Sequence, residues 1–232
     1  MSGARIAIER LGEDALLLRL GDGIDATTNA RVHALAARIA ATRPAWLRDV
    51  VHAYASLALF VDGDAFPADA DPLAEAERWL DAVPSDATSP DAADAIDVRA
   101  TRIVEIPVRY GGEDGPDLDA VAAHAGLSPH DVIALHCAGE YQVAMLGFAP
   151  GFPYLLGMEP RLAMPRLATP RARVAAGSIG IGGAQTGIYP RSGPGGWRLI
   201  GRTWVKLFDA AREPPAALAP GDRVRFVAVT AT

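Results

Sequence analysis

The sequence predicts an α+β protein in which a small mixed layer of strands and helices is followed by a β barrel. In the N-terminal part, pairs of strand-like segments alternate with alanine-rich helical segments. A stretch around residues 84–97 is small, acidic and free of aromatic residues, which is typical of a linker. From Tyr141 onward, short apolar runs are separated by glycine and proline turns, as expected of a compact barrel.

The order of elements in the N-terminal half predicts an antiparallel sheet with both helices on one face. Alternating apolar residues indicate the strands, and alanine-rich segments indicate the helices. Asp25 or Thr27 is expected to cap the first helix, and Pro72 suits the first turn of the second. The expected elements are strands 5–10 and 15–20, helix 28–41, strands 47–54 and 57–62, and helix 71–83.

The C-terminal half begins with an alternating strand, expected at 101–110, and continues with two short helices at 118–125 and 128–137. Ser128 is a favourable N-cap, and Pro129 after it is well tolerated at the first helical position. A turn followed by an alternating segment at 220–229 predicts the strand that closes the barrel.

Composition and charge argue against several classes of function. The 232 residues are 50% hydrophobic and 22% charged, which suits a soluble protein with a buried core. The net charge of −6, without any basic run, argues against nucleic-acid binding. No apolar segment is long enough to span a bilayer, the N-terminus lacks the apolar core of a signal peptide, and Cys137 is the single cysteine. We therefore expect a cytoplasmic protein without a membrane or nucleic-acid partner.

The glycine-rich segment does not match the familiar nucleotide or hydrolase motifs. A G-x-G-x-x-G fingerprint starting at Gly180 would need glycine where Gln185 stands, and no GK[ST] sequence is present. A G-x-S-x-G elbow fails at Ser178 and Ser192, because another residue occupies the first glycine position. The histidines lack the spacing of metal ligands, so no metal site is expected. The glycines are interpreted as residues of tight turns, barrel corners and close backbone approaches.

Residues that could form a small-molecule site concentrate between positions 136 and 209. Gln185 can donate and accept hydrogen bonds, while Tyr189 and Trp197 each combine a ring with a polar group. These two aromatic residues could instead belong to the barrel core, and His136 could be a pocket base or a structural histidine. Arginines offer forks that match carboxylate or phosphate, although each alone could be a surface charge. They are Arg166, Arg171, Arg173 and Arg202.

Several long segments carry a resemblance to a known protein family. The C-terminal half contains LGFAPGFPYLLG, RLATPRARVAAGSIGIGGAQTGIYPRSGPGGWRLIGRT and PGDRVRF, and the N-terminal half contains LGEDALLLRLGD and DVVHAYASLALFVD. On these segments the chain resembles the family of the 5-oxoprolinase B subunit, also called allophanate hydrolase subunit 1. That family includes the sporulation-kinase inhibitor of bacilli and corresponds to subdomain C of a carboxyltransferase domain. The resemblance covers nearly the whole chain, with one departure at His52, where proline is expected.

The resemblance implies a ferredoxin-like α+β domain over residues 1–84, a linker over 85–97 and a cyclophilin-like β barrel over 98–232. It also implies one component of a heteromeric, ATP-dependent enzyme that opens 5-oxoproline, a cyclic amide, to glutamate together with 5-oxoprolinase subunits C and A. ATP would be bound by, or shared with, a partner protein of that assembly. Two alternatives stay open: half of a biotin-dependent urea or amide carboxyltransferase, and a histidine-kinase inhibitor.

The site residues fall in or near the glycine-rich segment. The resemblance implies catalytic roles for His136 and Gln185, while the backbone at Gly182 and Gly183 is expected to donate hydrogen bonds to developing oxyanion charge. The resemblance assigns neither a nucleophile nor a general base among the candidates. The remaining residues expected to bind substrate are Arg166, Arg171, Tyr189 and Trp197.

Overall fold

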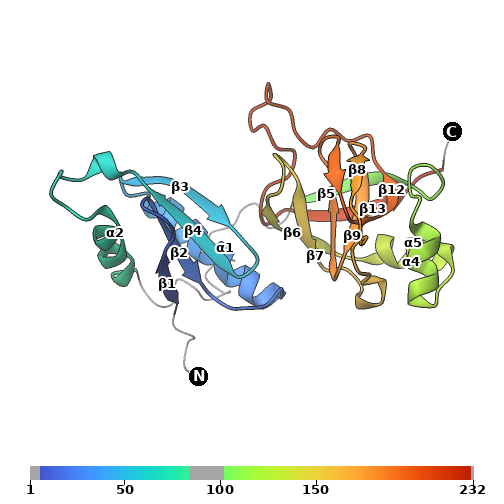
Figure 1. Ribbon diagram of the computed structural model, residues 1–232, viewed down its shortest axis with the longest axis horizontal. Helices are drawn as coiled ribbons and strands as arrows, with labels where there is room; N and C mark the ends of the chain where they lie inside the picture. The colour runs from blue at the N-terminus through green and yellow to red at the C-terminus, as the bar shows by residue number, and fades with distance from the viewer. Residues whose placement is uncertain (1–5, 84–101, 231–232) are drawn as a thin grey trace. The chain divides into compact units, whose positions relative to one another are not determined.

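Residues 6–83 and 102–230 are described by the computed structural model shown in Figure 1. The chain divides into two units, Met1–Val98 and Arg99–Thr232, and each has its own hydrophobic core. The linker predicted over 85–97 lies outside the described residues. The predicted α+β class, with a mixed layer that precedes a barrel, is confirmed.

The N-terminal unit is a four-stranded sheet with two helices. Its strands run in the order β1-β2-β4-β3, and every neighbouring pair is antiparallel. The chain order ββαββα is that of a ferredoxin-like βαββαβ unit with its last strand moved to the front. Its elements are β1 (Ala7–Arg10), β2 (Ala15–Arg19), α1 (Ala26–Thr42), β3 (Leu47–His52), β4 (Ser56–Val61), the 3-10 helix η1 (Gly63–Ala65) and α2 (Pro72–Asp81).

One face of this sheet carries the core of the N-terminal unit. Leu57 and Leu59 of β4 stand opposite Leu18 and Leu16 of β2, and all four side chains are buried. These leucines belong to one apolar cluster together with residues of both helices. The helices α1 and α2 therefore cover the same face of the sheet, as predicted.

Capping residues explain where the helices begin. The Asp25 side chain accepts a hydrogen bond from the Thr28 backbone N–H at 2.8 Å, so Asp25 caps α1. Asp71 accepts from two backbone N–H groups at the start of α2. In the C-terminal unit, Ser128 and Asp131 form a reciprocal capping box at the start of α5.

The C-terminal unit is a closed barrel whose strands run in the order β10-β7-β6-β13-β5-β12-β9, with β9 hydrogen-bonded back to β10. The strands β5 and β13 are parallel, and the other neighbouring pairs are antiparallel. The strand β13 pairs with both β5 and β6, which confirms the prediction that it closes the barrel. The barrel strands are β5 (Ile103–Tyr110), β6 (Tyr141–Leu146), β7 (Pro153–Leu156), β9 (Ser178–Gly182), β10 (Gln185–Ile188), β12 (Arg198–Arg202) and β13 (Arg223–Ala228).

Four further elements and one short 3-10 helix flank the barrel. The strands β8 and β11 form a separate two-stranded ribbon, and the helices α4 and α5 lie beside one another (Figure 1). These elements are α4 (Leu118–Ala125), α5 (Pro129–Ala138), η3 (Pro160–Leu162), β8 (Arg171–Val174) and β11 (Gly193–Gly195).

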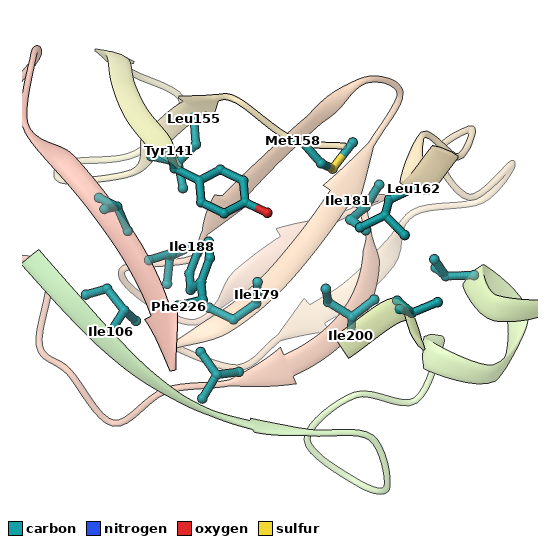
Figure 2. Close-up of a cluster of buried hydrophobic side chains, with 14 of the residues drawn as sticks. Ile106, Tyr141, Leu155, Met158, Leu162, Ile179, Ile181, Ile188, Ile200 and Phe226 are labelled. Atoms are coloured by element: carbon teal, nitrogen blue, oxygen red, sulfur yellow. The ribbon is translucent and has the colours of Figure 1, made fainter. Parts of the chain in front are cut away.

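Branched aliphatic and aromatic side chains fill the barrel (Figure 2). Ile179 and Ile181 of β9 and Ile188 of β10 are completely buried, and Phe226 of β13 packs 5.0 Å from the Tyr141 ring. Side chains of α4 and α5 belong to the same cluster, so the two helices share the barrel's core. The barrel interior is therefore packed, and any site must lie at its surface or its ends.

Candidate functional site

A small recess with aromatic walls lies on the C-terminal unit, and we call it the aromatic recess. It encloses about 150 Å³, whereas pockets for drug-sized ligands are about 300–1,000 Å³. Its size therefore suits a molecule smaller than a typical drug-sized ligand. The main side chains of its lining are Phe148, Phe152, Tyr154, Arg166, Tyr189 and Trp197. The lining is completed by Leu167, Pro170, Gly195 and Gly196.

The rings of the aromatic recess pack edge to face. The Phe152 ring centroid lies 5.3 Å from that of Tyr189 and 5.5 Å from that of Trp197, with the ring planes nearly perpendicular. Tyr154 packs against Trp197 at 5.8 Å. Tyr189 and Trp197 are only 3% and 5% exposed, so the walls are held in place by their neighbours.

Glycines in the barrel strands make room for these rings. A methyl group on Gly182 would lie 2.5 Å from Nε1 of Trp197, and one on Gly195 would lie 2.5 Å from the Tyr189 hydroxyl. A methyl group on Gly187 would come within 3.0 Å of the Phe152 ring. Several of these glycines therefore lie within strands and seat aromatic rings against the backbone, which are close approaches of the kind expected from the sequence.

Phe148 stands at the rim of the aromatic recess in an unusual backbone conformation. Its φ is +62°, a region that costs a non-glycine residue about 1–3 kcal/mol. Its ring is packed 5.4 Å from Phe152 and 6.2 Å from Tyr189, yet the residue is 65% exposed. Strain that places an apolar ring at the mouth of a recess is typical of a binding loop.

Arg166 supplies the positive charge of the aromatic recess. Its guanidinium carbon lies 5.7 Å from the Trp197 ring centroid, within the range of a cation–π interaction. Burial raises the pKa of Tyr154 and of Tyr189, and the nearby Arg166 charge opposes this rise in both. The two phenols therefore remain protonated at neutral pH and can donate hydrogen bonds.

Arg171 lies behind the aromatic recess and is paired with Asp117. One guanidinium nitrogen donates to the Asp117 carboxylate at 2.8 Å, and another donates to the Trp197 carbonyl at 3.5 Å. The second Asp117 oxygen accepts from the Leu199 backbone N–H at 2.7 Å. This pair ties the start of α4 to β8 and to the residues that carry Trp197, so it fixes a wall of the recess.

His136 is enclosed in the barrel, where its neighbours fix its tautomer. Thr186 Oγ1 donates to the Gly180 carbonyl at 3.0 Å, so its oxygen accepts from His136 Nε2–H at 3.3 Å. The His136 Nδ1 atom then accepts from the Tyr110 hydroxyl at 2.7 Å, and the Cys137 thiol donates to that hydroxyl at 3.6 Å. Burial lowers the pKa of His136 to about 3, so the imidazole is neutral at physiological pH.

The predicted site residues are thus divided among three places. Arg166, Tyr189 and Trp197 line the aromatic recess, Gly182 lies against the Trp197 ring, and Arg171 bonds to the Trp197 carbonyl. The other three predicted residues do not line the recess.

His136 lies in the interior, and Gln185 and Gly183 lie at the connection between β9 and β10. The Gly183 N–H donates to the Met164 carbonyl at 2.8 Å, so in this structure it is not available to an oxyanion.

The family model described as carboxyltransferase domain, subdomain C and D, matches residues 6–218. The chain belongs to this carboxyltransferase-domain family. The match spans both units and confirms the resemblance inferred from the sequence.

Two curated relatives that match nearly the whole of this carboxyltransferase-domain chain share one name. The chain is 44% identical to the 5-oxoprolinase B subunit of Bacillus subtilis (strain 168), covering 97% of this chain and 94% of that protein. It is 42% identical to the 5-oxoprolinase B subunit of Escherichia coli O157:H7, covering 94% and 93%. Urea amidolyase of Saccharomyces cerevisiae is 31% identical over 49% of this chain, which is 7% of that protein.

A solved structure, that of TTHA0988, is similar to this chain with a TM-score of 0.78 and 40% sequence identity. The similarity covers 94% of this chain and 40% of the TTHA0988 chain. This carboxyltransferase-domain chain therefore spans less than half the length of that protein.

Several recess residues are missing from the set that the sequence predicts. Phe148, Phe152 and Tyr154 all lie within GFAPGFPY, whose aromatic density between tight turns is the signal that could have identified them. Among the described residues there is no cluster of three or more histidine, cysteine, aspartate or glutamate side chains arranged to hold a metal ion. The described helices are also too short or too polar to cross a membrane.

Proposed function

We propose that this chain is the B component of a heteromeric, ATP-dependent 5-oxoprolinase that opens 5-oxoproline to glutamate, and that it is inactive without subunits C and A. The observation that carries the proposal is 44% identity to the 5-oxoprolinase B subunit of Bacillus subtilis along 97% of this chain and 94% of the relative. Identity of this extent includes both units, so it supports a shared role and not only a shared module.

The chemistry of the aromatic recess fits one part of such a reaction. Opening a cyclic amide requires activation of its carbonyl oxygen, addition of water to the carbonyl carbon, cleavage of the C–N bond and protonation of the nitrogen. Phosphorylation of the amide oxygen by ATP would release ADP and give an imidate-like phosphate that water attacks more readily, and inorganic phosphate would leave as the C–N bond opens to glutamate. Arg166 and the phenol groups of Tyr154 and Tyr189 can bind and stabilise negative charge, while partner subunits would supply ATP binding and proton transfer.

Reconstitution tests this proposal. The purified chain, the two companion subunits and all combinations of the three are incubated with ATP and 5-oxoproline, and glutamate and ADP are quantified. We expect glutamate and ADP in equal amounts from the complete mixture and none from this chain alone. Turnover by the isolated chain would contradict the requirement for partners, and an inactive complete mixture would contradict the activity.

A carboxyltransferase half is the second candidate function, favoured by the family description and by the similarity to urea amidolyase. The discriminating measurement is urea-dependent loss of carboxyl groups from carboxybiotin in the presence of this chain and its co-purifying partners. We expect no such loss. Recovery of a biotinylated partner with that activity would favour the carboxyltransferase function. Recovery of a histidine kinase as the sole partner would favour the third alternative, a histidine-kinase inhibitor.

A further inference from the structure

Arg166 is the single full charge among the described residues that line the aromatic recess. Within residues 6–83 and 102–230, the exposed Arg166 side chain makes no hydrogen bond or ion pair, and its guanidinium carbon lies 5.7 Å from the Trp197 ring centroid. Two nearby arginines, by contrast, have polar partners. Arg171 is bound to Asp117, and Arg198 donates to the Pro165 carbonyl at 3.2 Å. The N–H fork of Arg166 is therefore available to an incoming anion.

The surroundings of Arg166 favour a small anion. None of the described residues that line the recess carries a carboxylate, so an incoming anion meets no like charge. Tyr154 and Tyr189 also face the recess, and the Arg166 charge is close enough to influence both phenols. The exposed Phe148 ring offers an apolar surface to the body of a small, flat molecule.

The recess is also held in shape before any ligand arrives. Gly182 and Gly195 allow the Trp197 and Tyr189 rings to lie against the backbone, and the pair Arg171–Asp117 holds the Trp197 carbonyl. Such preorganisation lowers the entropic cost of binding, so a site of this size can hold a small molecule without a partner protein.

We propose that the aromatic recess is a carboxylate subsite in which Arg166 forms a two-point contact with the carboxylate of a small cyclic acid whose ring lies against Phe148. This inference rests on the proposed function, because 5-oxoproline is a five-membered cyclic amide with one carboxylate. Arg166 is then the specificity-determining residue that separates 5-oxoproline from urea, which has no carboxylate. The isolated chain binds the acid without ATP and without partner subunits.

A matched pair of ligands tests the carboxylate contact. The purified full chain is titrated with 5-oxoproline and with 2-pyrrolidinone, the same ring without the carboxylate, by calorimetry and by NMR of the tryptophan indole N–H signals. We expect 5-oxoproline to bind roughly 10- to 100-fold more tightly, the range for a hydrogen bond to a charged group. We also expect it to shift the Trp197 indole signal, which is assigned with a Trp197→Phe variant. Equal affinity for the two ligands, or an unmoved Trp197 signal, would overturn the proposal.

Three arginine variants separate the carboxylate contact from general charge. Arg166→Gln should reduce 5-oxoproline affinity to that of 2-pyrrolidinone, and Arg166→Lys should restore only part of it, because lysine lacks the planar fork. Arg191 is exposed and does not line the recess, so Arg191→Gln serves as the control and should bind like the unmodified chain. Unchanged binding by Arg166→Gln, with an unchanged melting temperature, would refute the role of Arg166.

The outcomes for this subsite and for the proposed function are independent. If the complete mixture hydrolyses 5-oxoproline but the isolated chain shows no carboxylate-dependent binding, the subsite is refuted and the function stands. If the isolated chain binds 5-oxoproline through Arg166 but the complete mixture forms no glutamate, the subsite stands and the function is refuted.

Discussion

At the scale of single residues, the aromatic recess depends on positions where a side chain is absent. Gly182 and Gly195 leave space that the Trp197 and Tyr189 rings occupy, and Gly187 does the same for Phe152. A sequence does not distinguish a glycine chosen for positive φ from one chosen for a close approach, because both select the same residue. The recess therefore could not be located from the glycine pattern alone.

The seating of Trp197 on Gly182 gives a first prediction. Gly182→Ala places a methyl group 2.5 Å from the Trp197 indole nitrogen, so the ring must shift, and we expect a loss of about 1–3 kcal/mol in the free energy of unfolding. Gly193→Ala is the matched control, because a methyl group there meets no atom within 4 Å. Chemical denaturation of both variants checks this. Equal stability of the two would contradict this packing of Trp197.

The buried imidazole of His136 gives a second prediction, which concerns pH. Its pKa is lowered from 6.5 to about 3 by burial, so below pH 6.5 the unfolded chain takes up a proton that the folded chain does not. This contribution to stability is complete above pH 6.5 and is lost as the pH falls toward 3. The loss is about 1.4 kcal/mol per pH unit within that window.

Unfolding of the barrel between pH 7 and pH 4, followed by its NMR amide signals, tests this pH dependence. The variant His136→Gln lacks the imidazole and should show a shallower decline in stability than the unmodified chain. A slope unchanged by the substitution would mean that His136 takes up its proton while the protein is folded.

Residue chemistry predicts part of the site. Arg166, Tyr189 and Trp197 combine charge or polarity with a turn-rich segment, and they line one recess. For His136 the sequence allows both a pocket base and a structural histidine, and only its depth in the barrel separates these alternatives. Depth depends on the pairing of distant strands, so local sequence does not reveal it.

At the scale of elements, local signals are sufficient for the helices and most strands. Caps at Asp25, Asp71 and Ser128 fix helix starts through contacts that span only two or three residues. The ribbon of β8 and β11 is not predictable as a separate sheet, because its two strands are joined only by pairing across the glycine-rich segment. Register between such segments is set by tertiary packing.

The partly buried pair Asp117–Arg171 gives a prediction at this scale, because it joins α4 to β8 and β12. Asp117→Asn keeps the shape of the side chain but removes its charge, so we expect a loss of about 1.5–3 kcal/mol in unfolding free energy. The exposed pair Glu105–Arg225, 3.7 Å apart, provides the control: Glu105→Gln should cause no measurable change.

Urea denaturation of the two variants and of the double variant Asp117→Asn, Arg171→Gln measures the coupling. We expect the double variant to lose less stability than the sum of the single losses. Strict additivity would show that the two residues act independently.

At the scale of the whole molecule, the two units have separate cores. Apolar residues of β2, β4, α1 and α2 form one cluster, and those of the barrel form another. Each cluster is large enough to support an independent fold in principle, since domains with their own core commonly fold alone.

Separate cores give a prediction about a fragment. A fragment of residues 99–232 should fold by itself and keep the NMR signals of the barrel, including the Trp197 indole resonance. Residues 1–98 expressed alone provide the reciprocal measurement. A barrel fragment that is unfolded, or that gains its spectrum only when residues 1–98 are added, would contradict independent folding.

The parallel pairing of β5 with β13 has a consequence for synthesis of the protein. Ile103 lies opposite Arg223, so β5, the strand made first in the barrel, acquires its parallel partner only after about 120 more residues have been joined, although its antiparallel partner β12 is made earlier. Until then a growing chain on the ribosome presents two unpaired sheet edges, the state most prone to aggregation. Translation pauses upstream of residue 223 should therefore prolong the time for which the nascent chain needs chaperones.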